Sequence, residues 1–307
     1  TIGNMSAIRL GTRASTLATT QSEMVARLLR SEGLDVDLTT ITTHGDTSTA
    51  SLAAMGGIGV FASAIRATLL KGEADIAVHS FKDLPTGRPL GLAIGAVPAR
   101  ADPRDALVAR DGLTLHDLPQ EASVGTGSPR RAAQLLAVRP DLTIVDIRGN
   151  VDTRLGRVKG LGHYAKGGGK EDLDAVVLAA SGLARLGHSG TVTEFLDPSV
   201  VLPAPAQGAL AVECRTADSR HGKLAKALAR IDDRRTRLAA TAERAVLSHL
   251  EAGCAAPIGA LAQLKPVSGS SPQVLTLDVV VATVDGSRII REQVSVELPA
   301  EVEPALA

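Results

Sequence analysis

The chain has 307 residues, enough for two or three domains, and 44% of them are apolar, which predicts a sizeable buried core. Its 33 basic residues balance its 33 acidic residues, so no overall field attracts nucleic acid or an anionic membrane. Aromatic residues make up only 1%, which removes the stacking platforms of single-strand nucleic-acid binders.

Targeting and metal signals are absent from the sequence pattern. No run of about 18 apolar residues predicts a membrane span, and the opening residues, 1–6, lack the basic and then apolar character of a secretory signal. The two cysteines, Cys214 and Cys254, cannot form a disulfide framework or a zinc site alone. We therefore expect a reduced, cytoplasmic protein that holds no metal.

A strand, a glycine-bearing turn and a helix follow one another at two places in the chain. The predicted strand, turn and helix are Ala7–Leu10, Gly11–Ser15 and Leu17–Leu29 at the first, and Ser123–Val124, Gly125–Arg131 and Ala132–Val138 at the second. Asp75–Ser80 and Asp174–Ser181 are a second matching pair, each a strand that begins with Asp and ends in Ser. The repetition predicts two similarly built, doubly wound α/β halves with mainly parallel sheets, and a ligand cleft between them.

The last third of the chain has a different pattern. Leu202–Gly208 is a proline-rich crossing, Thr236–Leu250 is an amphipathic helix, and Glu251–Gly259 is a loop. Two alternating runs, Val274–Val281 and Ile289–Leu298, predict strands. This order predicts a small α+β domain at the carboxyl end of the chain.

Polar and basic residues gather where predicted strands give way to helices. Such turns expose N–H groups and hydroxyls that bind anions, and the planar guanidinium of arginine pairs with carboxylates. The alternative to anion binding is that the hydroxyls only cap helices and that the arginines are solvated surface residues. Because such polar and basic residues recur at the ends of predicted strands and helices, we expect them to bind a multiply anionic small molecule. The candidate residues are Arg13, Ser15, Thr126, Ser128, Arg130, Arg131, Arg148, Arg154 and Arg185.

Ser80, Lys82 and Asp83 follow a strand that looks buried. A Lys beside an Asp is usually a surface turn, but at a strand's carboxyl end Asp83 is a candidate general acid or base, with Lys82 as an anion contact. We interpret His79 as a core residue or as a residue that supports the site from behind, rather than as a ligand. The loop around Cys254 makes its sulfur reachable, although a buried, inert thiol is the commoner case. Cys214 fits that commoner case, and Met55–Gly59 is a candidate lid.

Several segments together resemble the porphobilinogen deaminase family over nearly the whole chain. The motifs that carry the resemblance occur in the family's order: Gly11–Ser15, Ala77–Pro85, Asp102–Ala106, Arg148–Arg154, Leu202–Gly208 and Glu251–Gly259. The resemblance implies two domains with the bilobed fold of periplasmic binding proteins and a small third domain. It places them at residues 1–100 with 203–226, at 101–202 and at 227–307.

The resemblance also implies the chemistry. Cys254 would carry a dipyrromethane cofactor through a thioether, and four porphobilinogens would join it head to tail with loss of ammonia, before water frees hydroxymethylbilane. Asp83 would be the catalytic carboxylate of this transferase, and Phe61 would belong to a lid. The carboxylates of the growing chain would pair with the arginines named above, helped by Ser15, Ser80, Lys82, Thr126 and Ser128.

The chain departs from the family pattern at three places. Gly127 stands where the family usually has Ser, Ile58 and Ala62–Ala64 replace charged lid residues, and Gly162–Lys170 is longer than usual. Two rival classes are a non-catalytic bilobed receptor for a small anion and a cysteine-nucleophile transferase or hydrolase that uses His79. We expect a monomer whose partner is its small-molecule substrate.

Overall fold

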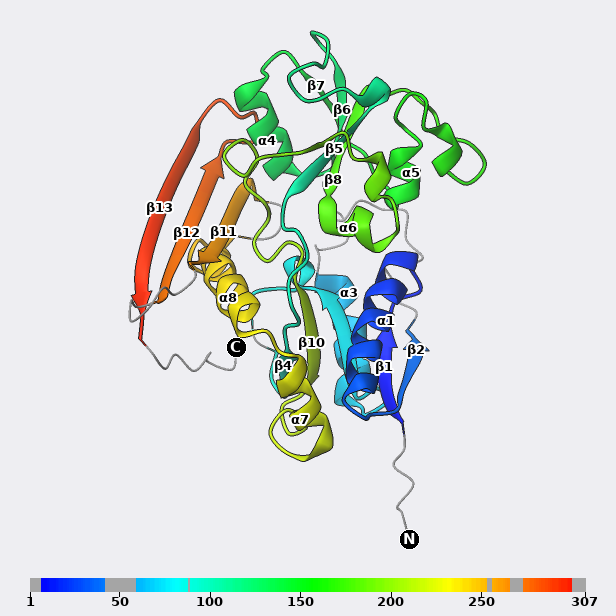
Figure 1. The fold of residues 1–307 in the computed structure, drawn as a ribbon, viewed down its shortest axis with the longest axis vertical. Coiled ribbons are helices and arrows are strands. Elements are labelled where there is room, and N and C mark those ends of the chain that lie inside the picture. Colours follow the sequence, from blue (N-terminus) through cyan, green and yellow to red (C-terminus); the bar gives the residue numbers. More distant parts are fainter. Residues whose placement is uncertain (1–6, 42–58, 88, 253–255, 266–272, 300–307) are drawn as a thin grey trace. The chain divides into compact units, whose positions relative to one another are not determined.

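The computed structural model describes residues 7–41, 59–87, 89–252, 256–265 and 273–299, and it divides the chain into two compact units (Figure 1). Unit 1 contains the described residues of Thr1–Arg100 and Ala209–Thr241. Unit 2 contains those of Ala101–Gly208 and Ala242–Ala300. The division into three domains stays a prediction.

Unit 1 is built on a five-stranded sheet in which the chain order is rearranged. Its strands in spatial order are β2 (Val36–Thr40), β1 (Ile8–Thr12), β3 (Ile76–Ser80), β10 (Leu210–Arg215) and β4 (Leu92–Ala96). β1 is parallel to β2 and β3, whereas β10 is antiparallel to both of its neighbours. The sheet is therefore mixed, because the strand that returns from the crossing runs against the others.

Helices cover both faces of this sheet. Val25 and Leu29 of α1 (Thr16–Ser31), with Leu228 of α7 (Gly222–Ile231), share one apolar cluster with the strands. Ile65 and Leu69 of α3 (Gly59–Leu70) form a second cluster on the other face. Unit 1 is thus a doubly wound α/β structure, as the sequence predicts.

Unit 2 repeats the same layout with different segments. Its sheet has the spatial order β7 (Thr143–Val145), β6 (Ser123–Gly125), β8 (Ala175–Ala179), β5 (Asp105–Ala109) and β9 (Glu194–Phe195). β6 is parallel to β7 and β8, and β5 is antiparallel to β8 and β9. Three parallel strands followed by an antiparallel one occur in both sheets, which confirms the predicted similarity of the two halves.

Helices also cover both faces of the unit 2 sheet. Leu135 of α4 (Pro129–Val138) packs on one face. Leu155 of α5 (Val151–Leu155) and Leu183 of α6 (Ala180–Arg185) pack on the other. The apolar side chains of β5 alternate between the two clusters, since Leu107 belongs to the first and Val108 to the second.

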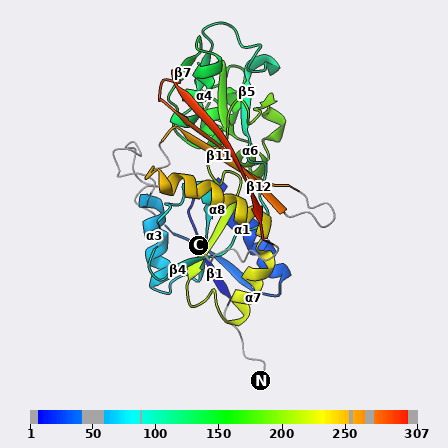
Figure 2. The ribbon, with the colours of Figure 1, turned by 90° about the vertical axis from the view of Figure 1, so that its left-hand side faces the viewer.

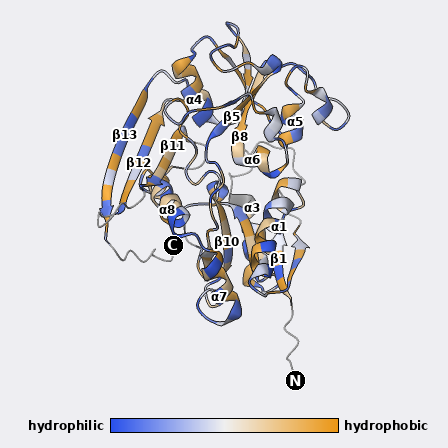
Figure 3. Ribbon diagram, in the orientation of Figure 1, coloured by the Kyte–Doolittle hydropathy of each residue, from blue (hydrophilic) through white to orange (hydrophobic). Residues whose placement is uncertain are grey.

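A three-stranded antiparallel sheet completes unit 2 (Figure 2). It contains β11 (Ile258–Leu264), β12 (Gln273–Ala282) and β13 (Ile289–Leu298). Glu243 of α8 (Arg234–His249), a helix that begins in unit 1, is fully buried and accepts hydrogen bonds from the N–H groups of Ala206 and Ala262. Polar and apolar residues alternate in the second half of β13, Val294–Leu298 (Figure 3).

One local expectation, the direction of the strands, differs from the structure. The antiparallel strands within the two sheets were not predicted, because periodicity indicates a strand but not its direction. The long segment Gly162–Lys170 contains three successive glycines, Gly167–Gly169. Gly167 and Gly168 are exposed, with φ values of +84° and +92°, but a side chain on Gly169 would collide with the backbone of Gly156. The last of the three glycines is therefore packed, not free.

Candidate active site

In unit 1 the predicted site residues lie at the carboxyl ends of two neighbouring strands. Arg13 and Ser15 follow β1, and Ser80, Lys82 and Asp83 end or follow β3, which is paired in parallel with β1. Parallel neighbours end at the same edge of a sheet, so the structure brings these five residues to one edge.

Asp83 is held at that edge by its neighbours. It ends the short 3-10 helix Phe81–Asp83, and its side chain is exposed while Phe81 and Leu84 are buried. The N–H of Phe81 donates to the carbonyl of Ala209 at 3.0 Å, which joins the turn to the start of β10. Burial on both sides fixes the backbone, so the carboxylate is presented from a rigid position.

Two hydroxyls of this edge already have partners. The Ser80 hydroxyl lies 3.0 Å from Nε2 of Gln21, a buried residue of α1. The Ser15 side chain accepts a hydrogen bond from the N–H of Ala18 and caps α1. Helix capping was the alternative interpretation of Ser15, and the structure shows Ser15 in that role. Gln21 was not predicted, although a Gln on the apolar face of a helix is itself a signal.

His79 is largely enclosed within unit 1, with 9% of its side chain exposed. Its Nε2 is 3.3 Å from Oε2 of Glu213, whose other oxygen is 3.0 Å from Nη2 of Arg66. Burial opposes ionisation of Glu213, but His79 and Arg66 outweigh burial and hold the pKa of that carboxyl below its usual value. The imidazole thus faces a buried carboxylate, which speaks against its use as the base of a cysteine nucleophile.

In unit 2 the candidate anion-binding residues follow three adjacent parallel strands. Thr126 and Ser128 come after β6, Arg148 after β7, and Arg185 ends the helix that follows β8. Thr126 is buried, and its hydroxyl accepts a hydrogen bond from the N–H of Ser128 at 3.2 Å. Ser128 precedes α4 without capping it through its side chain. The turn is therefore ordered by Thr126 and the backbone.

Gly127 of this turn is enclosed by its surroundings. A Cβ atom there would lie 2.7 Å from the carbonyl oxygen of Ile147 and 3.2 Å from Oδ1 of Asp146. A serine at this position would require the segment that follows β7 to shift. The departure from the family pattern thus has a packing reason within this chain.

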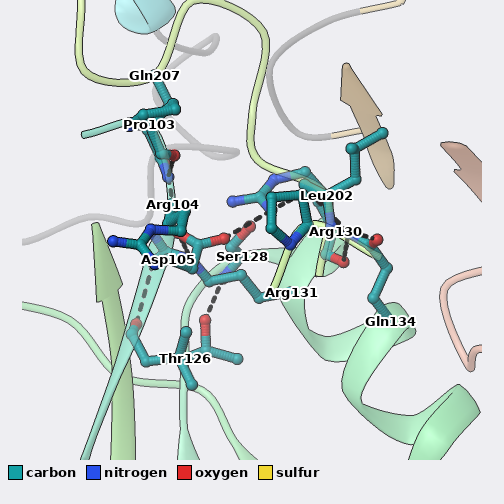
Figure 4. Close-up of polar contacts among 12 residues, drawn as sticks. Pro103, Arg104, Asp105, Thr126, Ser128, Arg130, Arg131, Gln134, Leu202 and Gln207 are labelled. Atoms are coloured by element: carbon teal, nitrogen blue, oxygen red, sulfur yellow. Dashed lines mark hydrogen bonds and ion pairs between the residues drawn. The ribbon is translucent and has the colours of Figure 1, made fainter. Parts of the chain in front are cut away.

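Arg130 and Arg131 are buried in the first turn of α4 and share one carboxylate (Figure 4). Nη1 of Arg130 lies 2.8 Å from Oδ2 of Asp105, and Nη2 of Arg131 lies 2.8 Å from its Oδ1. Each guanidinium also donates to a backbone carbonyl, Leu202 for Arg130 and Val177 for Arg131. Asp105 was not predicted as a site residue, although its motif was recognised.

Arg154 lies among other positive charges. Its pKa is lowered by burial and by the charges of Arg131 and Arg148. Its Nε donates to the carbonyl of Gly149 at 2.9 Å, and Arg148 is exposed, 3.1 Å from Asp146. The structure therefore brings Arg154 close enough to Arg131 and to Arg148 for their charges to oppose its own.

Arg185 has an incompletely satisfied guanidinium. Its Nη2 donates to the carbonyl of Gly208 at 2.6 Å, but its buried Nε has no hydrogen-bond partner among the described residues. Burial lowers its pKa to about 10, so the group stays charged at neutral pH. A buried donor without a partner is costly, and a carboxylate ligand would satisfy it.

The remaining predictions concern cysteine, the lid and metals. Cys254, residues 55–58 and the side chain of Phe61 lie outside the described residues. Cys214 is fully buried, and burial raises the pKa of its thiol to about 12, which fits the predicted inert thiol. Within the described ranges, no group of His, Cys, Asp and Glu is arranged to hold a metal, and no helix is long and apolar enough to cross a membrane.

Comparisons with known proteins show to which family the chain belongs. Residues 8–223 match the family model described as "Porphobilinogen deaminase, dipyromethane cofactor binding domain", and residues 237–305 match "Porphobilinogen deaminase, C-terminal domain". A porphobilinogen deaminase of Cutibacterium acnes is 96% identical over 303 residues, which cover 99% of this chain and 91% of the relative. One of Micrococcus luteus is 54% identical over 327 residues, with 99% of this chain and 86% of the relative covered.

A solved structure with a remote likeness is protein PG110 from Staphylococcus aureus. It is 12% identical, with a TM-score of 0.42, over 77% of this chain and 91% of that chain. The two family models together span both described units, and the relatives are similar over nearly the whole length. The chain therefore belongs to the porphobilinogen deaminase family.

Proposed function

We propose that this member of the family is a hydroxymethylbilane synthase, a transferase that joins four porphobilinogens head to tail with loss of ammonia at each addition. The excess of positive charge at one edge of the unit 2 sheet supports this most directly. Arg154 lies close enough to Arg131 and Arg148 for their charges to lower its pKa. Porphobilinogen carries an acetate and a propionate, so a growing chain of such units needs several cationic partners.

The basic residues of unit 2 fit a cofactor that carries carboxylates. The buried Nε of Arg185 lacks a partner among the described residues, and a carboxylate would supply the missing acceptor. Dipyrromethane, bound to Cys254 by a thioether, would supply the free pyrrole carbon to which the first porphobilinogen joins. Arg148, Arg154 and Arg185 would hold its carboxylates, and Thr126 and Ser128 would add neutral hydrogen bonds.

Asp83 would handle protons and charge at the reacting position. The aminomethyl carbon of porphobilinogen loses ammonia, and the nearby carboxylate stabilises the positively charged pyrrole that remains. A carbon–carbon bond then forms between that carbon and the free pyrrole carbon of the growing chain. The proton lost from the attacked carbon passes to Asp83. The exposed, rigidly anchored position of Asp83 is suited to this role.

The Asp83→Asn variant tests this assignment. We expect it to keep the unfolding temperature and the bound cofactor but to lose at least about 100-fold in kcat, the usual effect of removing a general acid or base. Asp37→Asn is a matched control, because Asp37 is an exposed aspartate on β2 of the same unit. Near-normal formation of hydroxymethylbilane by the Asp83 variant would exclude the proposed role.

Neither rival class is supported. The comparisons indicate an enzyme family rather than a non-catalytic receptor, and Nε2 of His79 faces the carboxylate of Glu213. The cytoplasmic location, the monomeric state and the lid role of Phe61 stay predictions.

A further inference from the structure

Asp105 is the only acidic group that the described residues place against both buried arginines of α4. It begins β5 and is fully buried, and the side chains of Arg130 and Arg131 are 5% and 7% exposed. Oδ1 also accepts hydrogen bonds from Nε of Arg131 at 3.0 Å and from Nε2 of Gln207 at 2.8 Å. One carboxylate thus organises two cations and an amide.

The charges of this cluster do not cancel. Two guanidiniums face one carboxylate, which leaves a net positive charge in a buried place. Burial opposes ionisation of Asp105, but the two arginines outweigh it and hold its pKa well below the usual range. Asp105 is therefore ionised at neutral pH, and the surplus charge calls for an anionic ligand, because unpaired buried charge is costly.

The same contacts fix the orientation of the arginines. The two N–H bonds of Nη1 in Arg130 are directed to Asp105 and to the carbonyl of Leu202. Arg131 donates to Asp105 through Nε and Nη2, and to the carbonyl of Val177 through Nη1. Arg131 also lies close enough to Arg154 to lower its pKa. The donors that remain therefore belong to guanidiniums that cannot turn without leaving Asp105.

We propose that Asp105 is a positioning residue for carboxylate binding: it holds Arg130 and Arg131 in one orientation and neutralises one of their two charges, so that the pair takes one carboxylate of the substrate or cofactor. This inference rests on the proposed function of the two arginines. Gln207, whose Nε2 also donates to the carbonyl of Pro103 at 2.8 Å, links this cluster to the crossing segment at residues 203–208.

The test compares Asp105→Asn with a matched control, Asp174→Asn. Asp174 is also a buried carboxylate of unit 2 that contacts two cations, Nε of Arg110 at 2.9 Å and Nζ of Lys159 at 2.8 Å. Asp174 lies just before the first residue of β8, whereas Asp105 is paired with Ala179, the last residue of that strand. The two carboxylates therefore lie at opposite ends of β8. Both variants lose a buried ion-pair network, but only one network contains proposed ligand-binding arginines.

KM and kcat for porphobilinogen, cofactor content by intact mass, and the unfolding temperature are measured for both variants. We expect Asp105→Asn to lower kcat/KM about 10- to 100-fold, mainly through KM, the range for a lost hydrogen bond to a charged group. A folded Asp105→Asn protein without cofactor would also support the proposal. Asp174→Asn should lower the unfolding temperature and leave KM within about twofold. Equal KM values in Asp105→Asn and Asp174→Asn would overturn the proposal.

A third variant separates this inference from the function on which it rests. If Arg131→Met has the KM and cofactor content of the parent, the assignment of Arg131 itself fails. If Arg131→Met is impaired and Asp105→Asn is not, only the positioning role fails. Because Asp105 acts through Arg131, the double variant should lose little more than Arg131→Met alone. Should Asp105→Asn not fold, Asp105→Glu carries the test: a raised KM supports positioning, and an unchanged KM overturns it.

Discussion

Nη2 of Arg185 donates a hydrogen bond to the carbonyl oxygen of Gly208 at 2.6 Å, while the Nε of the same guanidinium is buried without a partner among the described residues. The side chain is thus ordered by one contact and left with an unused donor. A buried donor without a hydrogen-bond acceptor lowers the free energy of unfolding. We therefore expect Arg185 to lower the stability of the folded protein and to strengthen the binding of a carboxylate.

Replacing Arg185 by Met should therefore separate the two properties. We expect kcat/KM for porphobilinogen to fall about 10- to 100-fold, since one charge-assisted pair is lost. The unfolding temperature should stay the same or rise, because a buried charge is removed. Arg220→Met, at an exposed position of unit 1, is the control and should change neither value. An Arg185→Met protein with unchanged kinetics would remove Arg185 from the binding site.

The Gly127→Ser variant should be less stable although it restores the usual residue of the family. The added Cβ would meet the carbonyl of Ile147 at 2.7 Å, so the backbone must move. Overpacking of this kind costs about 1–3 kcal/mol of unfolding free energy, which denaturant titration measures. Gly182→Ser is the control, because nothing lies within 4 Å of a Cβ at that position. Equal midpoints for the two variants would contradict the packing explanation.

Unit 1 should lose stability on acidification through Glu213. Its folded-state pKa lies below the ordinary value of 4.5, because His79 and Arg66 outweigh the effect of burial. The contacts of the Glu213 carboxylate therefore contribute stability that is present above pH 4.5 and is lost as the pH falls through the folded-state pKa of Glu213. We expect Glu213→Gln to be less stable at pH 7 and to approach the parent protein towards pH 3. Parallel stability curves over that range would show that Glu213 is not the group involved.

Thiol counting tests the assignment of the two cysteines. If Cys254 carries a thioether and Cys214 is buried with a pKa of about 12, the native protein should not react with a thiol reagent at pH 8. In denaturant one thiol should react, the two cysteines of the chain minus the one in the thioether.

Cys254→Ser should lack the added mass of the cofactor and still expose one thiol in denaturant. Two reactive thiols in the denatured parent protein, with no added mass, would contradict attachment at Cys254.

Local sequence signals predicted much of the framework. The turn at Gly125–Arg131 and the strand at Asp75–Ser80 were recognisable because glycine-bearing turns and apolar runs depend on neighbouring residues only. The structure has strand β3 at Ile76–Ser80 and helix α4 at Pro129–Val138, close to those predictions. The repeated pattern also predicted two similar halves, and the two sheets share their layout.

Tertiary structure decided which partner each polar group has. Arg130 and Arg131 could be named as anion ligands from their turn, but their shared bond to Asp105 joins residues 25 and 26 positions apart. Glu213 reaches Arg66 over 147 positions. Such pairs depend on which strands become neighbours and in which direction they run, because that alone brings distant side chains within hydrogen-bonding distance. No local pattern in the sequence carries that information.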